Sequence, residues 1–387
     1  MKRCLRSVLA LLFVAAGVSS ASAQNASAAC DRACLKTMLD QYLNAVIKHD
    51  PAGAPLVVGF RQTENAINVR PGNGVWKTVT GLGKMQRRYF DPVTGQAGYY
   101  GLIEEGSDVV IATLRLRVEN RKLTEAEWYL ARANDPGLNG PRQSGRGPAN
   151  NYNTDYLTAN PPPERVVPRA QRSTREQLLA IVNSYFDAIT SHDGTVALTH
   201  PGCGRVENGS PTPAGSTLPP LARAGGPRGD GAGGPRAGVP GGAVPGGPPA
   251  GGPPGGPPAA GPPTGAPPAA GAPAGGRQGG GGAGDCVANL QNFNLSMVTG
   301  RRIPLIDEEA QTVLGMAVFI RRPGSPTPRN VFSEWFVVDD GKIRNIWTAM
   351  FYPPPELAVP NWPPYEGNWP LPATTIPAPA TPPAGRQ

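Results

Sequence analysis

One short stretch of this chain occurs twice, and this repeat constrains the fold more than any other feature. The first copy reads Gln-Tyr-Leu-Asn-Ala-Val-Ile-Lys-His-Asp and ends at Asp50, and the second reads Ser-Tyr-Phe-Asp-Ala-Ile-Thr-Ser-His-Asp and ends at Asp193. A Glu-Asn pair follows each copy, at Glu64 and at Glu207. The His and the Glu of the second copy each lie 143 residues after those of the first (49 to 192 and 64 to 207). Because the distance between the expected helix end and the following strand is the same in both copies, the sequence predicts two tandem domains of one fold.

The segment before each His-Asp pair has the pattern of an amphipathic helix. Apolar residues recur there at three- and four-residue spacing, which indicates one buried face. We expect the first face to hold Leu35, Met38, Leu39, Tyr42, Leu43, Val46 and Ile47, and the second to hold Leu178, Leu179, Ile181, Val182, Tyr185, Phe186 and Ile189. Pro51 ends the first helix because it disfavours helical geometry in the preceding residue. Ser173 and Glu176 predict a capping box that starts the second.

Strand-like runs follow each helix and Glu-Asn pair. The runs lie near residues 96–104, 109–118 and 123–131 in the first half, and near 312–321, 331–338 and 342–351 in the second, with residues 75–85 read as irregular. Residues 113–118 alternate between apolar and polar side chains, as in a half-buried antiparallel strand. The sequence therefore predicts an α+β class with two tandem cone-shaped barrels, each a long helix packed on a strongly curved antiparallel sheet. The domains are expected at residues 30–133 and 173–352, with a linker at 134–172.

Three segments lie outside the predicted domains. Residues 1–23 have the basic start, apolar run and small-residue cleavage site of a signal peptide, so we expect a periplasmic or secreted protein. No later run has the length and apolar character of a transmembrane helix. The Gly/Pro-rich insertion at 211–284 and the Pro-rich tail at 353–387 are too poor in apolar residues to form a core, which predicts disorder. Inert linkers are favoured over a wall-spanning or adhesive role.

The charged residues favour some partners and exclude others. The formal net charge is +8, but the basic residues of the linker stand in Pro/Gly-rich sequence without interleaved aromatic residues. Nucleic acid is therefore not an expected partner, whereas a weak attraction to an anionic envelope surface stays open. The chain has only three His, which are too scattered for most zinc sites, so no metal is expected.

Four cysteines remain after the predicted signal peptide, namely Cys30, Cys34, Cys203 and Cys286. In an oxidising compartment they favour structural disulfides over a metal or redox site. Three pairings are available, and sequence alone cannot choose among them. The most economical pairing joins Cys30 to Cys34, and Cys203 to Cys286 across the insertion.

Taken together, these elements resemble a known fold family. The helix ending in His-Asp, the Glu-Asn strand, the bent sheet and the hairpin at 338–343 look like the cone-shaped barrel of nuclear transport factor two, ketosteroid isomerases, scytalone dehydratase and SnoaL-like polyketide cyclases. More narrowly, Cys-Asp-Arg-Ala-Cys-Leu from Cys30, Gly-Val-Trp from Gly74, Arg-Val-Glu-Asn-Arg-Lys-Leu-Thr-Glu from Arg117 and Arg-Arg-Ile-Pro-Leu-Ile-Asp-Glu from Arg301 resemble an uncharacterised family of secreted fungal and bacterial proteins. The barrel hosts many functions, so it does not name a reaction.

The resemblance implies an apolar pocket in each cone with ionisable groups inside, and chemistry without a cofactor. The candidate acids and bases are His49 and Glu64 in the first domain and His192 and Glu207 in the second, since a buried carboxylate or an imidazole exchanges protons near neutral pH. Asn65 and Asn208 are candidate donors to an oxyanion. Further candidates for substrate binding lie on the pocket wall or on the last two strands: Trp76, Arg115, Glu127, Glu334 and Trp347.

Structural interpretations of the same residues stay open. His and Asp commonly cap helix ends, and a Glu-Asn pair after an arginine is equally typical of a buried salt-bridge network. Trp347 replaces Glu127 at the matching hairpin position, so the two pockets are not expected to be equivalent. Relatives often form homodimers through the outer face of the sheet, and the tandem repeat is expected to supply that contact within one chain.

Two functions of different classes follow from the sequence. The first is a secreted cofactor-independent lyase or isomerase that acts by acid/base chemistry on a small hydroxylated aromatic or polyketide-like molecule. The second is a non-catalytic module of the cell envelope that binds a small molecule or a protein. The position of the His/Glu pairs discriminates between them: a pocket containing both side chains favours the enzyme, and side chains that cap backbone groups favour binding.

Overall fold

The computed structural model describes residues 30–140, 150–212, 286–288, 290–293, 295–322 and 324–353. These residues belong to one compact unit of the chain. The predicted signal peptide, nearly all of the predicted insertion and the tail after residue 353 lie outside the described residues.

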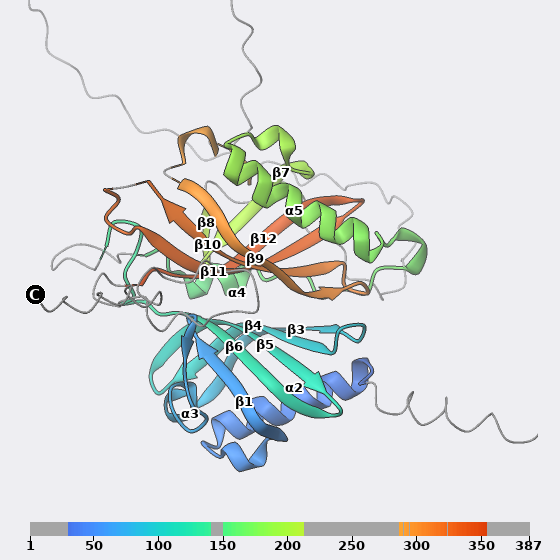
Figure 1. The fold of residues 1–387 in the computed structure, drawn as a ribbon, viewed down its shortest axis with the longest axis vertical. Coiled ribbons are helices and arrows are strands. Elements are labelled where there is room, and N and C mark those ends of the chain that lie inside the picture. The colour runs from blue at the N-terminus through green and yellow to red at the C-terminus, as the bar shows by residue number, and fades with distance from the viewer. Residues whose placement is uncertain are drawn as a thin grey trace, which may run out of the picture. The chain divides into compact units, whose positions relative to one another are not determined.

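The first domain is a long helix followed by a six-stranded sheet (Figure 1). Its sheet has the strand order β2-β1-β6-β5-β4-β3. The elements are α2 (Arg32–Ile47), η1 (Pro51–Gly53), β1 (Leu56–Glu64), β2 (Ile67–Asn68), α3 (Val75–Thr78), β3 (Gly81–Asp91), β4 (Gln96–Glu105), β5 (Asp108–Glu119) and β6 (Lys122–Ala131).

The second domain repeats this plan with the order β8-β7-β12-β11-β10-β9. Its elements are α5 (Arg175–Ser191), η3 (Gly194–Val196), β7 (Thr199–Glu207), β8 (Ser210–Thr212), η4 (Leu290–Asn292), β9 (Leu295–Asp307), β10 (Thr312–Arg321), β11 (Arg329–Asp339) and β12 (Lys342–Phe351). The fold class is therefore α+β in two tandem domains, each with a helix on a curved sheet.

The sheets differ from the prediction in two respects. Strands β1 and β7, which carry the Glu-Asn pairs, lie parallel to β6 and β12, so the sheets are mixed rather than purely antiparallel. The long strands β3 and β9 were not predicted. Both have irregular register against the next strand, as at Leu82/Gln86 and Leu314/Met316. Such bulges bend a sheet and interrupt the alternation that makes a strand recognisable in sequence.

Both predicted helices form, and their apolar faces line the interiors of the two sheets. In α2 the expected residues are buried together with Ala45, and Ile47 is only partly buried. In α5 the prediction was wrong for Leu179, which is 41% exposed. The capping box is also one residue later than predicted: the Thr174 side chain accepts from the Gln177 backbone, and the Gln177 side chain accepts from the Thr174 backbone.

The two sheets contact each other within the chain through their outer faces. This contact has an apolar cluster drawn from both domains, which includes Tyr89, Tyr129, Leu314, Trp335 and Trp347. The Tyr89 and Trp335 rings stack with centroids 4.6 Å apart. The outer faces, through which relatives were expected to dimerise, are thus occupied by the tandem copy.

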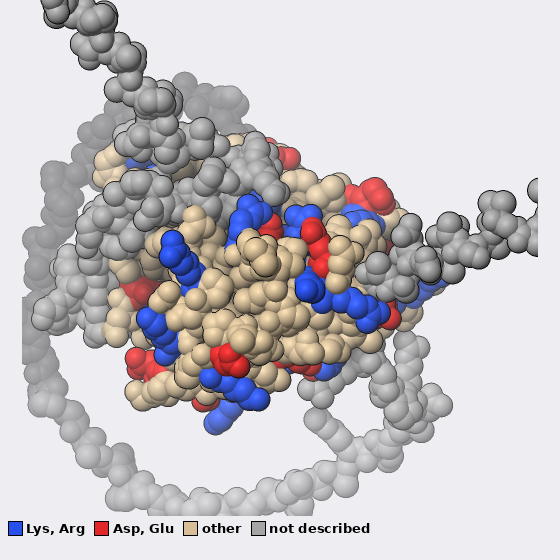
Figure 2. All heavy atoms as spheres, turned by 60° about the horizontal axis from the view of Figure 1, so that its bottom comes forward, with Lys and Arg blue, Asp and Glu red and all other residues tan. Residues whose placement is uncertain are grey.

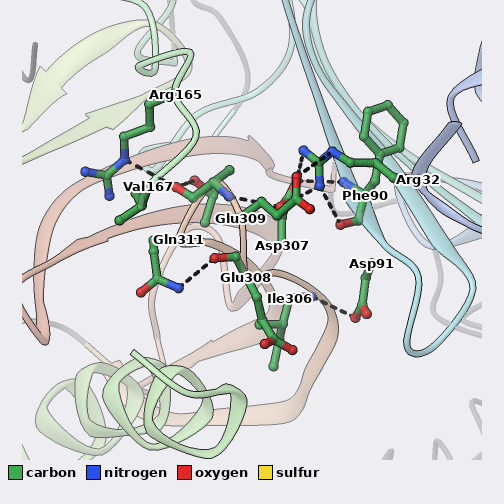
Figure 3. A network of polar contacts seen from close by, with 12 residues as sticks. Arg32, Phe90, Asp91, Arg165, Val167, Ile306, Asp307, Glu308, Glu309 and Gln311 are labelled. Atoms are coloured by element: carbon green, nitrogen blue, oxygen red, sulfur yellow. Dashed lines mark hydrogen bonds and ion pairs between the residues drawn. The ribbon is translucent and has the colours of Figure 1, made fainter. Parts of the chain in front are cut away.

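Two equivalent ion pairs stand at the edge of this contact. Figure 3 shows the first of them, Arg32 with Asp307, together with Asp91 of the second. Arg32, the first residue of α2, donates both terminal nitrogens to Asp307 at 2.9 Å, and Arg175, the first residue of α5, donates to Asp91 at 2.7 and 3.0 Å. The same carboxylates accept from the backbone of the opposite sheet, Asp307 from Phe90 and Asp91 from Ile306. Each domain therefore contributes the same set of groups, as in a two-fold symmetric dimer.

Part of the predicted linker is packed against both domains. Helix α4 (Thr154–Ala159) buries Leu157, and the Asn153 N–H donates to the carbonyl of Asn208. Beyond it, Arg165 forms an ion pair with Asp339 at 3.0 Å. This segment brings residues 150 and 151 to the second domain, where they line the cavity described below.

Both disulfides have the most economical pairing, Cys30 with Cys34 and Cys203 with Cys286. The second joins residues 83 positions apart and therefore ties together the two ends of the insertion. Among the helices in the described part of the chain, none combines the length and apolar character needed to cross a bilayer.

Candidate ligand-binding site

The second domain has a partly open cavity of about 540 Å³ between α5, its sheet and the segment before β9. Its apolar wall includes Ile189, Leu295, Phe319 and Met350, and its polar wall includes Tyr185, Arg205, Glu207, Arg321 and Tyr352. Asn150 and Asn151 from the packed linker line it as well. A mostly apolar cavity of this size with a few convergent polar groups is typical of a small-molecule site.

Arg205 is the centre of the polar wall because it lies between two glutamates. It donates to Glu207 at 2.7 Å, within strand β7, and to Glu334 of β11 at 2.9 and 3.0 Å. Glu334 is completely buried, and one of its carboxylate oxygens has no hydrogen-bond partner among the described residues. Burial raises the pKa of Glu334, although Arg205 acts in the opposite direction. Glu334 consequently holds its proton to a higher pH than an exposed glutamate.

Glu207 is the predicted residue that reaches the cavity, and three donors hold it. Besides Arg205, it accepts from the Tyr352 hydroxyl at 2.8 Å and from the Asn151 amide at 3.2 Å. Burial and the neighbouring Glu207 raise the pKa of the Tyr352 hydroxyl well above its ordinary value. Tyr352 therefore stays protonated at neutral pH and donates its hydroxyl hydrogen to Glu207.

The interior of the first domain is occupied by aromatic side chains instead. Tyr42, Trp76 and Trp128 are all buried. Gln62 accepts from the Tyr42 hydroxyl at 3.0 Å and from the Trp76 indole at 2.7 Å, and the Trp128 indole donates to Tyr42 at 3.1 Å. This neutral network satisfies the polar groups of the three rings internally.

Matching positions explain why the second interior differs. Gln62 and Arg205 are equivalent, offset by 143 residues like the two Glu-Asn pairs. Because Glu64 pairs with Trp128 in the register of β1 and β6, and Glu207 pairs with Thr348 in that of β7 and β12, Thr348 takes the place of Trp128. Replacing an indole by a hydroxyl removes volume from the interior, and replacing the amide by a guanidinium gives it charge.

Glu64 is only partly buried and lies beside α3 rather than in a described cavity. It accepts from the Val75 backbone at 2.8 Å and from the Gln62 side chain at 3.0 Å. Burial raises the pKa of its carboxyl group, and these hydrogen bonds partly offset that effect. Its neighbour Gly74 has a positive φ, and a side chain there would collide with the carboxylate.

Both predicted catalytic histidines bind backbone carbonyls. Nδ1 of His49 lies 2.7 Å from the carbonyl oxygen of Trp76. In the second domain Nδ1 of His192 lies 2.9 Å from Leu290 O, and Nε2 lies 3.1 Å from Leu295 O. Each histidine thus holds the helix end to the segment that follows, which is the capping interpretation and favours binding over catalysis.

The two predicted oxyanion donors are likewise engaged with backbone groups. The Asn65 amide donates to Leu130 O at 3.1 Å and accepts from Leu130 N at 2.8 Å. Asn208 makes the same pair of bonds with Met350, at 2.9 and 2.7 Å. Both asparagines therefore join the end of one strand to its parallel neighbour.

The remaining predicted binding residues are spread over three places. Trp76 and Glu334 lie inside the first and second domains, as described. Arg115 and Glu127 lie on the outer face of the first sheet, 3.1 Å apart, and Glu127 also pairs with Arg302 of the second domain at 2.9 Å. Although burial opposes it, Arg302 lowers the pKa of Glu127. Trp347 is also in this contact, where its indole donates to Asn160 O. The prediction that these three line a cone mouth was wrong, because the alternation of the last strands turns them outward.

Sequence reasoning missed four residues of the polar wall. Arg205 was noted only as a salt-bridge partner, although its i, i+2 spacing to Glu207 places both side chains on one face of a strand. Tyr185 was assigned to the helix core. The other two, Arg321 and Tyr352, stand at the ends of apolar strands, where nothing in the sequence shows whether they point inward.

Charged side chains on the molecular surface are mixed rather than clustered. On the face shown in Figure 2, lysine and arginine side chains are scattered among aspartate and glutamate. The exposed ion pairs of the molecule include Lys36 with Asp40 and Arg117 with Glu119. Within the described residues, no group of three His, Cys, Asp or Glu side chains is arranged to hold a metal ion.

Comparison with known proteins matches this chain to a family model and to solved structures. The model of a domain of unknown function, DUF8021, matches residues 171–242 and 261–350, which fall in the second domain and its insertion. Among solved structures, the chain is similar to a protein of unknown function with a cystatin-like fold from Methylobium petroleophilum PM1. Their sequences are 14% identical, the match covers 38% of this chain and 99% of the other, and the TM-score is 0.24. None of the curated proteins matches this chain.

Proposed function

We propose that the second domain binds a small organic molecule in its cavity and that the first domain is a structural copy. The cavity of about 540 Å³ carries this proposal, because it combines an apolar wall with the Arg205, Glu207 and Tyr352 groups. This volume falls in the range of about 300–1,000 Å³ that ligand pockets occupy. The equivalent interior of the first domain holds buried tryptophans, and both histidines bind backbone carbonyls.

A cavity-filling variant tests this proposal. Ala288 lines the cavity and is partly exposed, so Ala288→Trp places an indole in the cavity with little effect on the core. We expect compounds that bind the wild-type protein in calorimetric titrations to lose binding to this variant. Ala52→Trp, at an exposed position of the first domain, is the control and retains binding. Equal binding by both variants would place the ligand elsewhere.

A lyase or isomerase is the second candidate, and the contact between Glu207 and Tyr352 favours it. In such a reaction Glu207 would accept a proton from the substrate, and Tyr352, whose pKa is raised, would donate a hydrogen bond or proton. No cofactor enters this scheme, in keeping with the chemistry of the SnoaL-like and ketosteroid isomerase relatives that the sequence resembles. The substrate is a small hydroxylated aromatic or polyketide-like molecule.

Incubation with a panel of hydroxylated aromatic and keto compounds, followed by mass spectrometry and NMR, tests this second candidate. Glu207→Gln is expected to lower any turnover by about a hundredfold or more, since general base catalysis commonly contributes that much. Glu64→Gln, at the matching position of the first domain, is the control with unchanged turnover. Unchanged turnover in Glu207→Gln would remove this glutamate from the mechanism.

The compartment is also part of the proposal. The two disulfides support a function outside the reducing cytoplasm, in the periplasm or the medium. Envelope association and a homodimer are further expectations from the sequence, which size-exclusion chromatography and cell fractionation test.

A further inference from the structure

Arg321 is a buried cation that lines the cavity without an anionic partner in the described part of the chain. Arg321 is the last residue of strand β10 and is only 8% exposed. One guanidinium nitrogen lies 3.4 Å from Thr327 O, and the guanidinium carbon lies 5.4 Å from the centre of the Tyr352 ring. Burial lowers the pKa of Arg321, although Tyr352 and the more distant Glu207 act in the opposite direction. A guanidinium nevertheless stays cationic at neutral pH. A buried cation of this kind costs free energy unless an anion accompanies it.

In the first domain, the charged residue at the position equivalent to Arg321 has an ion-pair partner. Strands β4 and β10 each have ten residues, so Glu105 ends β4 where Arg321 ends β10. The residue after β6 is Arg132, and the residue after β12 is Tyr352. Arg132 donates to Glu105 at 2.7 and 2.8 Å, which closes an ion pair within the domain. In the second domain Arg321 stands at the position of the acid Glu105, and Tyr352 stands at the position of the cation Arg132, so this ion pair is not formed.

The nearest acid in the cavity is already neutralised. Glu207 accepts from Arg205, from Tyr352 and from Asn151, so its carboxylate has its charge balanced and its oxygens engaged. The second carboxylate, Glu334, lies behind Arg205 and is fully buried. Arg321 is therefore the group of the polar wall with binding capacity left for an incoming anion.

We propose, building on the small-molecule site above, that the cavity takes a monocarboxylate with an apolar body and that Arg321 pairs with its carboxylate. The guanidinium offers two parallel N–H groups that fit a carboxylate in bidentate geometry. Phe319, Leu295 and Ile189 on the apolar wall bury the rest of the molecule. The Tyr352 ring under the guanidinium holds it in place before the ligand arrives, which lowers the ordering cost of binding.

Calorimetric titration of the full chain with matched pairs of compounds tests this assignment. Each pair is an acid and its primary amide, with benzoate and benzamide as the first pair, and acetate as an acid without an apolar body. The proteins are the wild type, Arg321→Gln and Arg322→Gln; the last removes one positive charge from the exposed adjacent residue. We expect benzoate to bind at least about tenfold more tightly than benzamide and more tightly than acetate. This preference is lost in Arg321→Gln and kept in Arg322→Gln.

Two results would overturn this inference. The first leaves the proposed small-molecule binding intact, and the second contradicts it as well. If benzamide binds as tightly as benzoate, or Arg321→Gln keeps the preference, the carboxylate is not the recognised group while small-molecule binding stands. If neither the acids nor the amides bind to the wild type at millimolar concentration, the proposed function fails together with the inference.

Discussion

At the scale of single residues, the asparagines of the two Glu-Asn pairs have the same structural role, whereas the glutamates have different roles. Asn65 and Asn208 have φ angles of 50° and 45°, in the left-handed region that asparagine tolerates better than most residues. Each side chain bonds both backbone groups of one residue in the parallel neighbour strand. The glutamates before them have diverged: Glu207 lines a cavity beside Arg205, whereas Glu64 caps α3.

Replacing either asparagine by alanine removes two buried hydrogen bonds. We expect Asn65→Ala and Asn208→Ala each to lower the free energy of unfolding by about 1–3 kcal/mol, because the strand backbone loses its partner. Urea denaturation measures this loss. Asn120→Ala is the matched control, since Asn120 also has a φ of 50° but lies exposed in a hairpin turn. A loss in the control as large as in the other two would assign the effect to backbone strain.

The raised pKa of Glu64 gives a prediction about pH. Since the folded state holds the proton more tightly than the unfolded chain, this residue's stabilising contribution is full below its ordinary pKa of 4.5 and is lost as pH rises through the raised value. Glu64→Gln cannot ionise, so its stability relative to wild type should rise between pH 4 and pH 7. Exposed Glu104→Gln is the control. A difference that is constant or falls with pH contradicts the account.

At the scale of elements, the sequence predicts the helices and strands that have a regular hydrophobic period and misses the strands that contain bulges. The helices, the last three strands of each sheet and the hairpins follow from three- to four-residue spacing and from alternation. Strands β3 and β9 were missed because their bulges break the alternation, and the parallel pairing of β1 with β6 was missed because it joins residues far apart in sequence. The site was predicted through Glu207 and Glu334 alone, since the inward orientation of Arg321 and Tyr352 depends on how two strand ends meet.

Trp128 fills the first domain where Thr348 leaves space in the second, so Trp128→Ala should hollow the first interior. We expect the free energy of unfolding to fall by about 3–5 kcal/mol, as for other buried aromatic residues, with part of the loss due to Tyr42 losing its donor. Denaturant unfolding measures the change, and Trp128→Phe should lose less. Added indole should restore part of the stability of Trp128→Ala. Loss below about 1 kcal/mol would show that the first interior is not tightly filled.

At the scale of the whole molecule, the described residues form two copies that contact each other as a symmetric dimer would. The contacts of Asp91 repeat those of Asp307, down to the backbone N–H that each accepts three residues later, from Thr94 and from Ala310. Reciprocal contacts of this kind follow when two copies of one unit pack through the same face. One copy can then lose its pocket while the shared interface preserves the fold.

The reciprocity predicts equal effects from equivalent substitutions. Asp91→Ala and Asp307→Ala each remove the buried carboxylate partner of an arginine and leave several backbone donors without an acceptor, so each should lower the free energy of unfolding by about 3–5 kcal/mol. Denaturant unfolding of both variants checks this prediction. Asp187→Ala, which breaks the exposed pair with Arg301, should cost only about 0–1 kcal/mol. Strongly unequal losses in the two interface variants would argue against equivalent roles.

The central claim is that the second domain is hollow and takes a ligand while the first is filled. Methyl NMR of protein labelled at methionine tests this directly, because the chain has only 6 Met. Met350 lines the cavity and Met38 lies in the core of the first domain. On titration with benzoate we expect the Met350 methyl signal to shift and the Met38 signal to stay in place. A shift of Met38 with Met350 unmoved, or no shift of either, would contradict the account.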